Sequence, residues 1–464
     1  MKHILNFRKL FCFFILIQGY STVRAQSTQP SSPDTTKKPA VDTVVRKPEQ
    51  KPTLTIGLDM RTRAELKHGY RSLPVKDTSA AADISQRTRL NFDYKSKSLD
   101  VFLSIQDARI WGQQDPKEGQ TGSSTTASPS TTFPLYFFEA YAEPHFGSKF
   151  SMRIGRQRVI YDNQRLFSEN DWRVPANSHD GIRLIYNNNI NFTTELLAAF
   201  NQSGENTFTT KYQPILPNYK DLFVHYLNWK MTDKLALTTI NVMDGFQSSV
   251  PEKYTTTYQR FTSGGRLEYS AYNWYVTFSG YYQYGKDSSG KKIGAYYIQP
   301  EIRYSTNSFT ARLGMEYLSG ADSSTHPSND KNFVPLYGTS HRFLGNLDLF
   351  TSFPRDVNGA GLINPYLFFQ MKFNNVTLRM ENHLFYSQSK FVYNGTATDK
   401  YLGFENDWRL NYKPNKFTDI EIGACWAIVS KSMAIIKKGG DNTLIPYFGY
   451  VSLKLTPTLG KFTL

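Results

Sequence analysis

Apolar and charged side chains alternate one residue at a time through long stretches of this chain of 464 residues. Between residues 54 and 61, Leu54, Ile56 and Leu58 take even positions, whereas Asp59 and Arg61 take odd positions. A period of two is that of a β-strand, whose successive side chains point to opposite faces. The pattern predicts strands with one apolar and one charged face. It returns in the segments 87–94, 99–106, 190–200, 301–304, 312–317 and 404–410.

Two all-β architectures fit this pattern, a soluble β-sandwich and a transmembrane β-barrel. A sandwich rarely sustains such alternation over a region as long as residues 53–464 without a boundary between cores. A membrane barrel turns its apolar face to lipid and its charged face to a wet lumen, and closure removes exposed edges. The 30 Tyr, 33 Phe and 6 Trp suit its aromatic girdles. We predict a transmembrane antiparallel up-and-down β-barrel of about 18 strands, without membrane-spanning helices.

The chain divides into three parts by composition. Residues 1–25 place cations before the apolar run Leu10–Ile17 and end on the small residue Ala25, which is typical of a signal peptide. Residues 26–52 are rich in Ser, Thr, Pro, Lys and Asp, so they cannot bury a core, and we expect a flexible periplasmic leader. Residues 53–464 are expected to form the barrel.

Two kinds of segment separate the predicted strands. Short ones, such as 95–98 and 187–189, are expected to be turns on the periplasmic side. Long polar ones, such as 113–132, 202–218 and 322–332, are expected to be loops on the outside of the cell.

Arginine is frequent on the predicted inward face. Its rigid fork of donors matches carboxylates and phosphates, so a ladder of arginines in a wet channel favours anions. The same face carries many acids, so the alternative is that the arginines pair with them and stiffen the wall. The arginines are Arg61, Arg63, Arg87, Arg89, Arg153, Arg183, Arg266, Arg303, Arg312, Arg379 and Arg409. The acids that we expect as their lumen partners include Asp93, Glu139, Glu195, Glu268, Glu316, Glu405 and Asp407.

Motifs for catalysis or metal binding are absent from the sequence. The eight histidines are scattered, without a His-x-x-x-His pair, and there is no Gly-x-Ser-x-Gly elbow. Ser340 and His341 are adjacent but would face opposite sides of a strand. Cys12 lies in the signal peptide, which leaves Cys425 alone. We expect a protein that is not an enzyme, with no cofactor, no metal and, because its basic residues are interleaved with apolar ones, no nucleic-acid partner.

Several segments resemble the alginate export family of outer-membrane β-barrels, in the form common in Bacteroidota. The resemblance spans essentially the whole barrel region, and the block from Tyr337 to Asp348 is its most specific part. The segments that carry it are Arg153–Gln157, Arg165-Leu166, Asp171-Trp172, His179–Leu184, Pro335–Gly345 with Asp348 and Phe350, and Tyr401–Asp407.

The resemblance implies an 18-stranded barrel with an electropositive conduit for a polyuronate or another anionic polymer or solute. It places Arg153, Arg156, Arg165 and Arg183 in or near that conduit. Arg156 and Arg158 share the parity of the outward residues of their strand, where a cation at the bilayer midplane costs about 2–4 kcal/mol. We therefore expect them at the strand end, where a loop folds them inward.

Together these observations predict a channel in the cell outer membrane of a Gram-negative organism, through which anionic solutes diffuse or are exported without a catalytic step. The expected cargo is an alginate-like acidic polysaccharide or saccharide. The other expected partners are outer-membrane lipid, the barrel-assembly machinery during biogenesis and a periplasmic export or uptake partner. Two alternatives stay open: a general or solute-specific porin for nutrient uptake, and a loop-based surface-binding barrel without a transport role.

Overall fold

The computed structural model describes residues 51–112, 135–202, 218–253, 255–322 and 329–464. The expected signal peptide and nearly all of the expected leader lie outside these ranges. So do the whole loop 113–132, most of the loop 202–218 and part of the loop 322–332. Among the described residues, no helix has the length and apolar character needed to cross a membrane.

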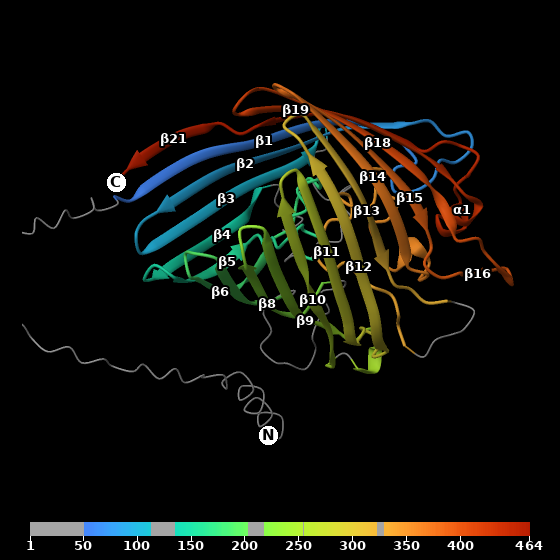
Figure 1. The fold of residues 1–464 in the computed structure, drawn as a ribbon, viewed down its shortest axis with the longest axis horizontal. Coiled ribbons are helices and arrows are strands. Elements are labelled where there is room, and N and C mark those ends of the chain that lie inside the picture. Colours follow the sequence, from blue (N-terminus) through green and yellow to red (C-terminus); the bar gives the residue numbers. More distant parts are fainter. Residues whose placement is uncertain (1–50, 113–134, 203–217, 254, 323–328) are drawn as a thin grey trace, which may run out of the picture. The chain divides into compact units, whose positions relative to one another are not determined.

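The described fold is almost entirely β-sheet (Figure 1). Two short strands, β16 and β17, form a separate hairpin, and the others belong to one sheet. The strands are β1 (Thr53–His68), β2 (Ala81–Lys95), β3 (Leu99–Ile110), β4 (Leu135–Phe146), β5 (Phe150–Gln157), β6 (His179–Asn187), β7 (Phe192–Phe200), β8 (Asp221–Lys230), β9 (Leu235–Gln247), β10 (Thr257–Ala271), β11 (Trp274–Lys286), β12 (Lys292–Ser305), β13 (Phe309–Leu318), β14 (Leu362–Phe373), β15 (Val376–Tyr386), β16 (Val392–Tyr393), β17 (Thr396–Ala397), β18 (Tyr401–Asn415), β19 (Thr418–Val429), β20 (Tyr447–Leu455) and β21 (Thr458–Thr463). The short helices are η2 (Pro251–Lys253), η3 (Arg355–Val357) and α1 (Lys431–Ile436).

The large sheet closes on itself. From β1 to β15 each strand pairs antiparallel with the next one in the chain, β15 pairs with β18, β18 with β19 and β19 with β20. The ring closes because β1 pairs both with β2 and with β20 and β21. The last two segments lie in series along β1, because Leu455 of β20 lies opposite Met60 and Thr458 of β21 lies opposite Gly57. They act as one interrupted strand, so the ring has eighteen strands, and the predicted antiparallel barrel is confirmed.

Neighbouring side chains on the strands face opposite sides of the barrel wall. In β7, Leu196 is 54% exposed on the outside, whereas Leu197 is 2% exposed and faces inward. In β8, Phe223 is exposed and Leu222 is fully buried. The outward face of the described strands is mainly apolar, as the alternation predicted.

Turns of two to four residues join the strands at one rim, and longer connections join them at the other (Figure 1). Side-chain chemistry explains the tight turns. Between β6 and β7, Oδ1 of Asn188 accepts hydrogen bonds from the backbone N–H groups of Ile190, Asn191 and Phe192. A single amide thereby satisfies the donors that the turn leaves without a strand partner.

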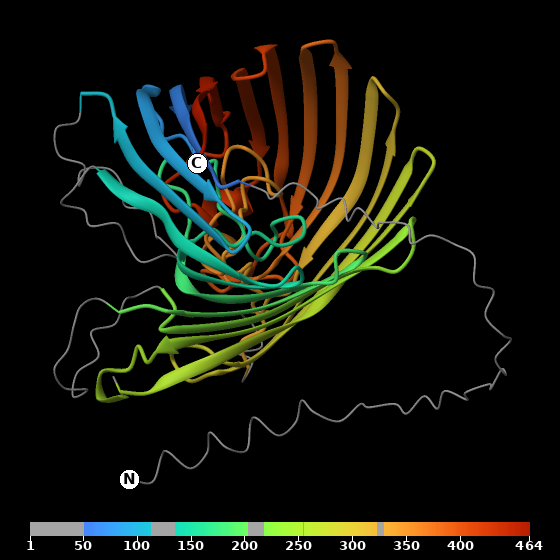
Figure 2. The ribbon, with the colours of Figure 1, turned by 90° about the vertical axis from the view of Figure 1, so that its left-hand side faces the viewer.

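Two of the long connections fold into the barrel instead of away from it (Figure 2). We call them the β5–β6 loop, residues 158–178, and the β13–β14 loop, residues 319–361, of which 323–328 are not described. A parallel bridge between Phe167 and Tyr337 joins the two loops. Both residues belong to an apolar core inside the barrel, together with Tyr219 and Tyr297.

This inner core corrects one expectation from the sequence. The inward face was expected to be ionic and wet throughout, yet Leu222, Val224, Ile240 and Val242 point inward on β8 and β9 and are at most 3% exposed. These side chains pack against the inserted loops in the same apolar cluster. Part of the barrel wall therefore serves as a packing surface for the loops, and the remaining lumen lies on the other side.

Candidate functional site

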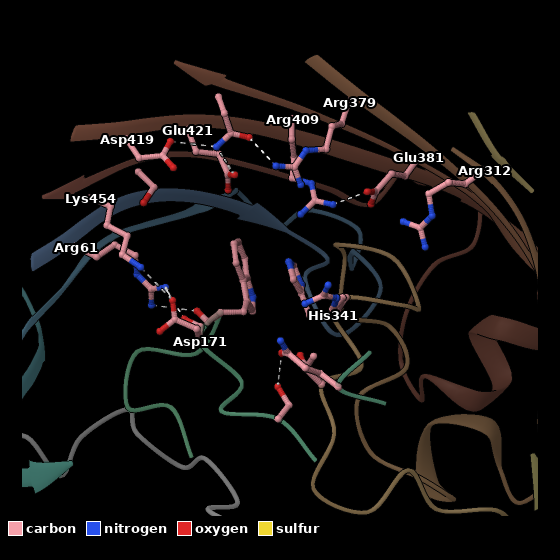
Figure 3. Close-up of a pocket in the computed structure, with 17 residues that line it drawn as sticks. Arg61, Asp171, Arg312, His341, Arg379, Glu381, Arg409, Asp419, Glu421 and Lys454 are labelled. Atoms are coloured by element: carbon pink, nitrogen blue, oxygen red, sulfur yellow. Dashed lines mark hydrogen bonds and ion pairs between the residues drawn. The ribbon is translucent and has the colours of Figure 1, made fainter. Parts of the chain in front are cut away.

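A pocket of about 420 Å³ lies in the lumen between the two inserted loops and the wall formed by β1, β13, β15 and β18–β20 (Figure 3). Cations outnumber acids among its lining residues. The cations are Arg61, Arg312, Arg342, Arg379, Arg409 and Lys454, and the acids are Asp171, Glu381, Asp419 and Glu421.

Two of these arginines are neutralised by carboxylates. Nη2 of Arg409 lies 2.5 Å from Oε1 of Glu381, and Nη2 of Arg312 lies 2.6 Å from Oε2 of Glu301. Both pairs hold wall strands together, β15 with β18 and β12 with β13. They leave little charge free for a solute.

Arg379 and Arg342 lack such a carboxylate among the described residues. Arg379 donates a hydrogen bond to Oδ1 of Asn411 at 3.2 Å and forms no ion pair. Arg342, on the β13–β14 loop, is exposed in the pocket and has neither a hydrogen bond nor an ion pair there. Although the Arg342 side chain is exposed to the pocket, the surrounding protein removes part of its hydration. This desolvation and the neighbouring cations Arg312 and Arg409 hold the pKa of Arg342 below its usual value. An anion in the pocket would relieve this mutual repulsion.

The sheet register places like charges directly opposite one another. Arg379 of β15 is paired with Arg409 of β18. Directly opposed like charges destabilise a sheet unless a counter-charge lies between them. Three further inward arginine pairs have the same relationship: Arg61 with Arg87, Arg153 with Arg183, and Arg303 with Arg312.

The arginines of β1 and β2 surround one carboxylate on the β5–β6 loop. Oδ1 of Asp171 lies 2.6 Å from Nη1 of Arg87 and 3.6 Å from Nη1 of Arg89, and its Oδ2 lies 3.8 Å from Nη1 of Arg61. These guanidinium groups hold the pKa of Asp171 far below its usual range, although burial opposes them. The cluster fixes the loop to the wall.

Arg63 strengthens this anchor. Its Nη1 donates to the carbonyl of Trp172 at 3.0 Å, and its guanidinium lies 3.9 Å from the centre of the Trp172 ring. The Trp172 ring also stacks on His341, with centroids 3.8 Å apart. His341 in turn is hydrogen-bonded through Nδ1 to Asp348 at 2.8 Å. Trp172 thus connects the wall with both inserted loops.

The remaining predicted arginines serve mainly as links within the wall or between wall and loop. Arg165 of the β5–β6 loop and Glu316 of β13 form a pair at 2.7 Å, and both side chains are at most 1% exposed. The others are Arg153 with Glu143 at 2.6 Å, Arg183 with Glu195 at 3.5 Å, Arg266 with Glu268 at 2.7 Å, and Arg303 over the Tyr275 ring at 4.2 Å.

The expectation that a loop folds Arg156 into the conduit is wrong. Arg156 lies opposite Asp180 in the β5–β6 register, and its Nε and Nη2 donate to that carboxylate at 2.7 and 2.8 Å. Both residues share the outward parity of Ile154 and Ile182, which are exposed. A carboxylate close by on the same face gives Arg156 its counter-charge without inward folding. Its neighbour Arg158 does fold inward and pairs with Glu139 at 2.7 Å.

The predicted acidic partners fall into two groups. Glu139, Glu195, Glu268 and Glu316 each pair with an arginine, and Asp93 lies 3.2 Å from Nζ of Lys95. Glu405 and Asp407 have no Lys or Arg within ion-pair distance in the described part of the chain, although both are at most 1% exposed.

Some pocket residues were not singled out from the sequence. Arg342 and Asp171 lie in loops, where the strand period gives no information about direction. Both belong to segments that carry the family resemblance. Membership of those segments was the sequence signal that could have pointed to them as site residues. Lys454 and Glu421 lie on β20 and β19 and have inward parity, so the strand period was the signal that could have found them.

The closed ring of antiparallel strands, its apolar exterior and its ionic lumen define an outer-membrane β-barrel channel. The sequence profile of the alginate export family matches residues 53–427, so the chain belongs to that family and resides in the outer membrane. No curated protein matches the sequence.

Solved outer-membrane barrels share the fold. OccAB1 of Acinetobacter baumannii has a TM-score of 0.59 at 11% identity, covering 88% of this chain and 97% of its own. OpdL of Pseudomonas aeruginosa has a TM-score of 0.58 at 11% identity, covering 88% of this chain and 99% of its own. OccK9 (OpdG) of P. aeruginosa has a TM-score of 0.59 at 10% identity, with 88% and 98% covered.

Proposed function

We propose that the protein is a passive channel for anionic solutes, with carboxylate-bearing saccharides as the preferred class. It has no catalytic step and no energy source of its own. The observation that carries the proposal is the pair of pocket guanidinium groups, Arg342 and Arg379, that have no carboxylate partner among the described residues.

The charge pattern around the pocket supports anions over cations. Free guanidinium groups attract carboxylates and offer them two parallel hydrogen bonds. The acids next to them, Glu381 and Glu421, keep the total positive charge moderate, so that a bound anion is released again. A pore conducts only when its sites bind weakly enough to empty.

The other predicted arginines are proposed to shape the channel and not to select its cargo. Arg61, Arg63, Arg87 and Arg89 hold the β5–β6 loop through Asp171 and nearby carbonyl groups. Arg165 holds the same loop through Glu316. We thus propose both roles that the sequence left open, anion selection and structural pairing, but for different arginines.

Of the alternatives, a surface-binding barrel is less well supported. The described parts of the β5–β6 and β13–β14 loops lie inside the barrel and pack in its apolar core, so they are not presented to a partner outside. A nutrient porin shares the proposed mechanism and differs only in the net direction of flow, which the concentration gradient sets.

Reversal potentials across a planar bilayer in a salt gradient test the proposal. We expect anion preference in the wild type and a loss of that preference in Arg342→Ala combined with Arg379→Ala. A unit charge about 7 Å away in water contributes about 0.6 kcal/mol, so each removal should lower the anion-to-cation permeability ratio roughly threefold. Salt screening makes the effect largest at low ionic strength.

Arg153→Ala is the matched control, because Arg153 is inward but paired with Glu143 and does not line the pocket. It should change the ratio much less than the pocket variants. Cation preference in the wild type, or equal effects of the pocket and control variants, would overturn the proposal.

A further inference from the structure

Four inward side chains on β15 and β18 form a square on the barrel wall. Glu381 lies directly opposite Asp407 in the register, and His383 lies directly opposite Glu405. All four are at most 8% exposed. Two carboxylates in directly opposed positions repel each other, so this arrangement needs a positive charge between them.

Hydrogen bonds fix which nitrogen of His383 carries the proton. Nδ2 of Asn364 donates to the carbonyl of Phe343 at 3.0 Å, which orients the amide so that its Oδ1 faces Nδ1 of His383 at 3.2 Å. Since an amide oxygen only accepts, Nδ1 of His383 is the donor. Nε2 is then left with a free lone pair, and it lies 3.9 Å from Oδ2 of Asp407.

The carboxylates of β18 are only half satisfied. Asp407 accepts a hydrogen bond from the backbone N–H of Asn346 at 3.0 Å, and Glu405 accepts one from that of Leu347 at 2.7 Å. Oδ1 of Asp407 and Oε2 of Glu405 are buried without a partner among the described residues. Buried carboxylate oxygens without partners are costly, so they indicate a ligand.

The square holds more carboxyl groups than paired cations. Arg409 pairs with Glu381 at 2.5 Å, whereas Glu405 and Asp407 have no Lys or Arg within ion-pair distance in the described part of the chain. The cation Arg312 is already paired with Glu301. A divalent cation would supply the positive charge that the carboxyl groups of β18 lack.

We propose that Glu381, His383 and Asp407 bind one divalent transition-metal ion. One ligand atom from each of the three lies within 4.8 Å of those of the others, close enough to surround a single ion. An imidazole with two carboxylates favours Zn²⁺ and similar ions over Ca²⁺ or Mg²⁺, which prefer oxygen alone. The Asn364 amide has the position of the outer partner that metal-bound histidines typically use.

Such an ion would fasten the β13–β14 loop as well as the wall. The backbone N–H groups of Asn346 and Leu347 donate to Asp407 and Glu405, and the ion would fix the orientation of the Asp407 carboxylate. Glu381 also lines the lumen pocket, so the site lies beside the proposed anion path. The inference does not depend on the proposed anion selectivity.

The test uses purified full-length protein in detergent, stripped with a chelator and titrated with Zn²⁺ by calorimetry. We expect one bound ion per barrel and a higher unfolding temperature with Zn²⁺. His383→Gln and Asp407→Asn should each weaken binding by at least about tenfold, and Asn364→Ala by about 10- to 100-fold. His225→Gln is the matched control, because His225 lies on β8 and bonds to Thr194 instead.

Absence of binding to the wild type, or equal binding by the His383→Gln and His225→Gln variants, would overturn the proposal. If a ligand variant does not form a barrel, X-ray absorption of the zinc-loaded wild type decides. An imidazole shell at about 2.0–2.1 Å together with oxygen ligands is expected. A spectrum without imidazole contradicts the site.

Discussion

Nη1 of Arg87 lies 2.6 Å from Oδ1 of Asp171, and this contact joins the second strand of the barrel wall to the tip of a loop 84 residues away in sequence. The Arg87 side chain is fully buried, whereas Asp171 keeps about a third of its surface exposed, with 32%. A buried guanidinium depends on its counter-charge, so the position of the loop and the stability of the wall are coupled.

Replacing Asp171 by Asn should release the β5–β6 loop. Arg87 would be left buried with Asp59 at 3.3 Å as its remaining partner. We expect a loss of unfolding free energy on the order of 2 kcal/mol, less than the roughly 3–5 kcal/mol of a fully buried pair because Asp171 is partly exposed. Single-channel recordings should show larger and noisier conductance. Unchanged conductance with an unchanged unfolding temperature would mean that the loop is held by other contacts.

Glu316→Gln should be more damaging to stability than Asp171→Asn. Arg165 and Glu316 are both at most 1% exposed, and removing one partner of a buried pair typically costs about 3–5 kcal/mol. Heat unfolding followed by mobility on gels measures the change. Glu268→Gln is the matched control, since Glu268 pairs with Arg266 but is 33% exposed. Similar unfolding temperatures for the two variants would contradict the prediction.

Acid should weaken the contact between the two inserted loops through His341. Burial holds the pKa of His341 below its usual 6.5. The unfolded chain therefore binds more protons than the folded chain in the interval between the two pKa values, and stability falls as the pH drops below about 6.5. The contribution of Asp348, whose pKa is also lowered, is lost only in more acidic solution.

Unfolding temperatures measured between pH 7 and pH 5 check this sign. We expect them to decrease with falling pH in the wild type. His341→Gln should be less stable at pH 7, because it loses the stacking on Trp172, but its slope with pH should be smaller. An identical slope in the two proteins would assign the pH dependence to other groups.

The cost of placing a charged residue on the outer face should depend on its depth in the membrane. Leu196 lies in the middle of β7, faces outward and is 54% exposed. Leu196→Arg should destabilise the barrel in lipid by about 2–4 kcal/mol, the cost of a cation near the midplane. Phe200→Arg is the control on the same face at the strand end, with an expected cost of about 0–1 kcal/mol. Equal costs would contradict the proposed membrane span.

The barrel itself was predictable from the sequence because lipid and water impose opposite demands on the two faces of each strand. That requirement repeats at every second residue, so the parity of residues such as Leu196 and Glu195 can be counted without knowing what lies opposite. It fails where a local partner changes the cost, as for Arg156 with Asp180, and on β8 and β9, where the inserted loops pack against an apolar inward face.

The site was less predictable for a physical reason. Whether an inward arginine is free depends on residues far along the chain, such as Asp171 for Arg87 or Glu316 for Arg165. The strand period gives no information about how a loop folds back. The square formed by Glu381, His383, Glu405 and Asp407 likewise depends on the register between two strands, so a search for spaced metal motifs within one segment does not find it.

Pairing of β1 with β20 and β21 has a consequence for how the protein is made. β1 is the first strand of the barrel to be synthesised, and its second pairing partners, β20 and β21, are the last. A chain that lacks β20 and β21 therefore has two unpaired edge strands, which can pair with other chains. Loss of residues 447–463 would turn a soluble export intermediate into an aggregation hazard, even though every residue of the lumen arginine pairs would still be present.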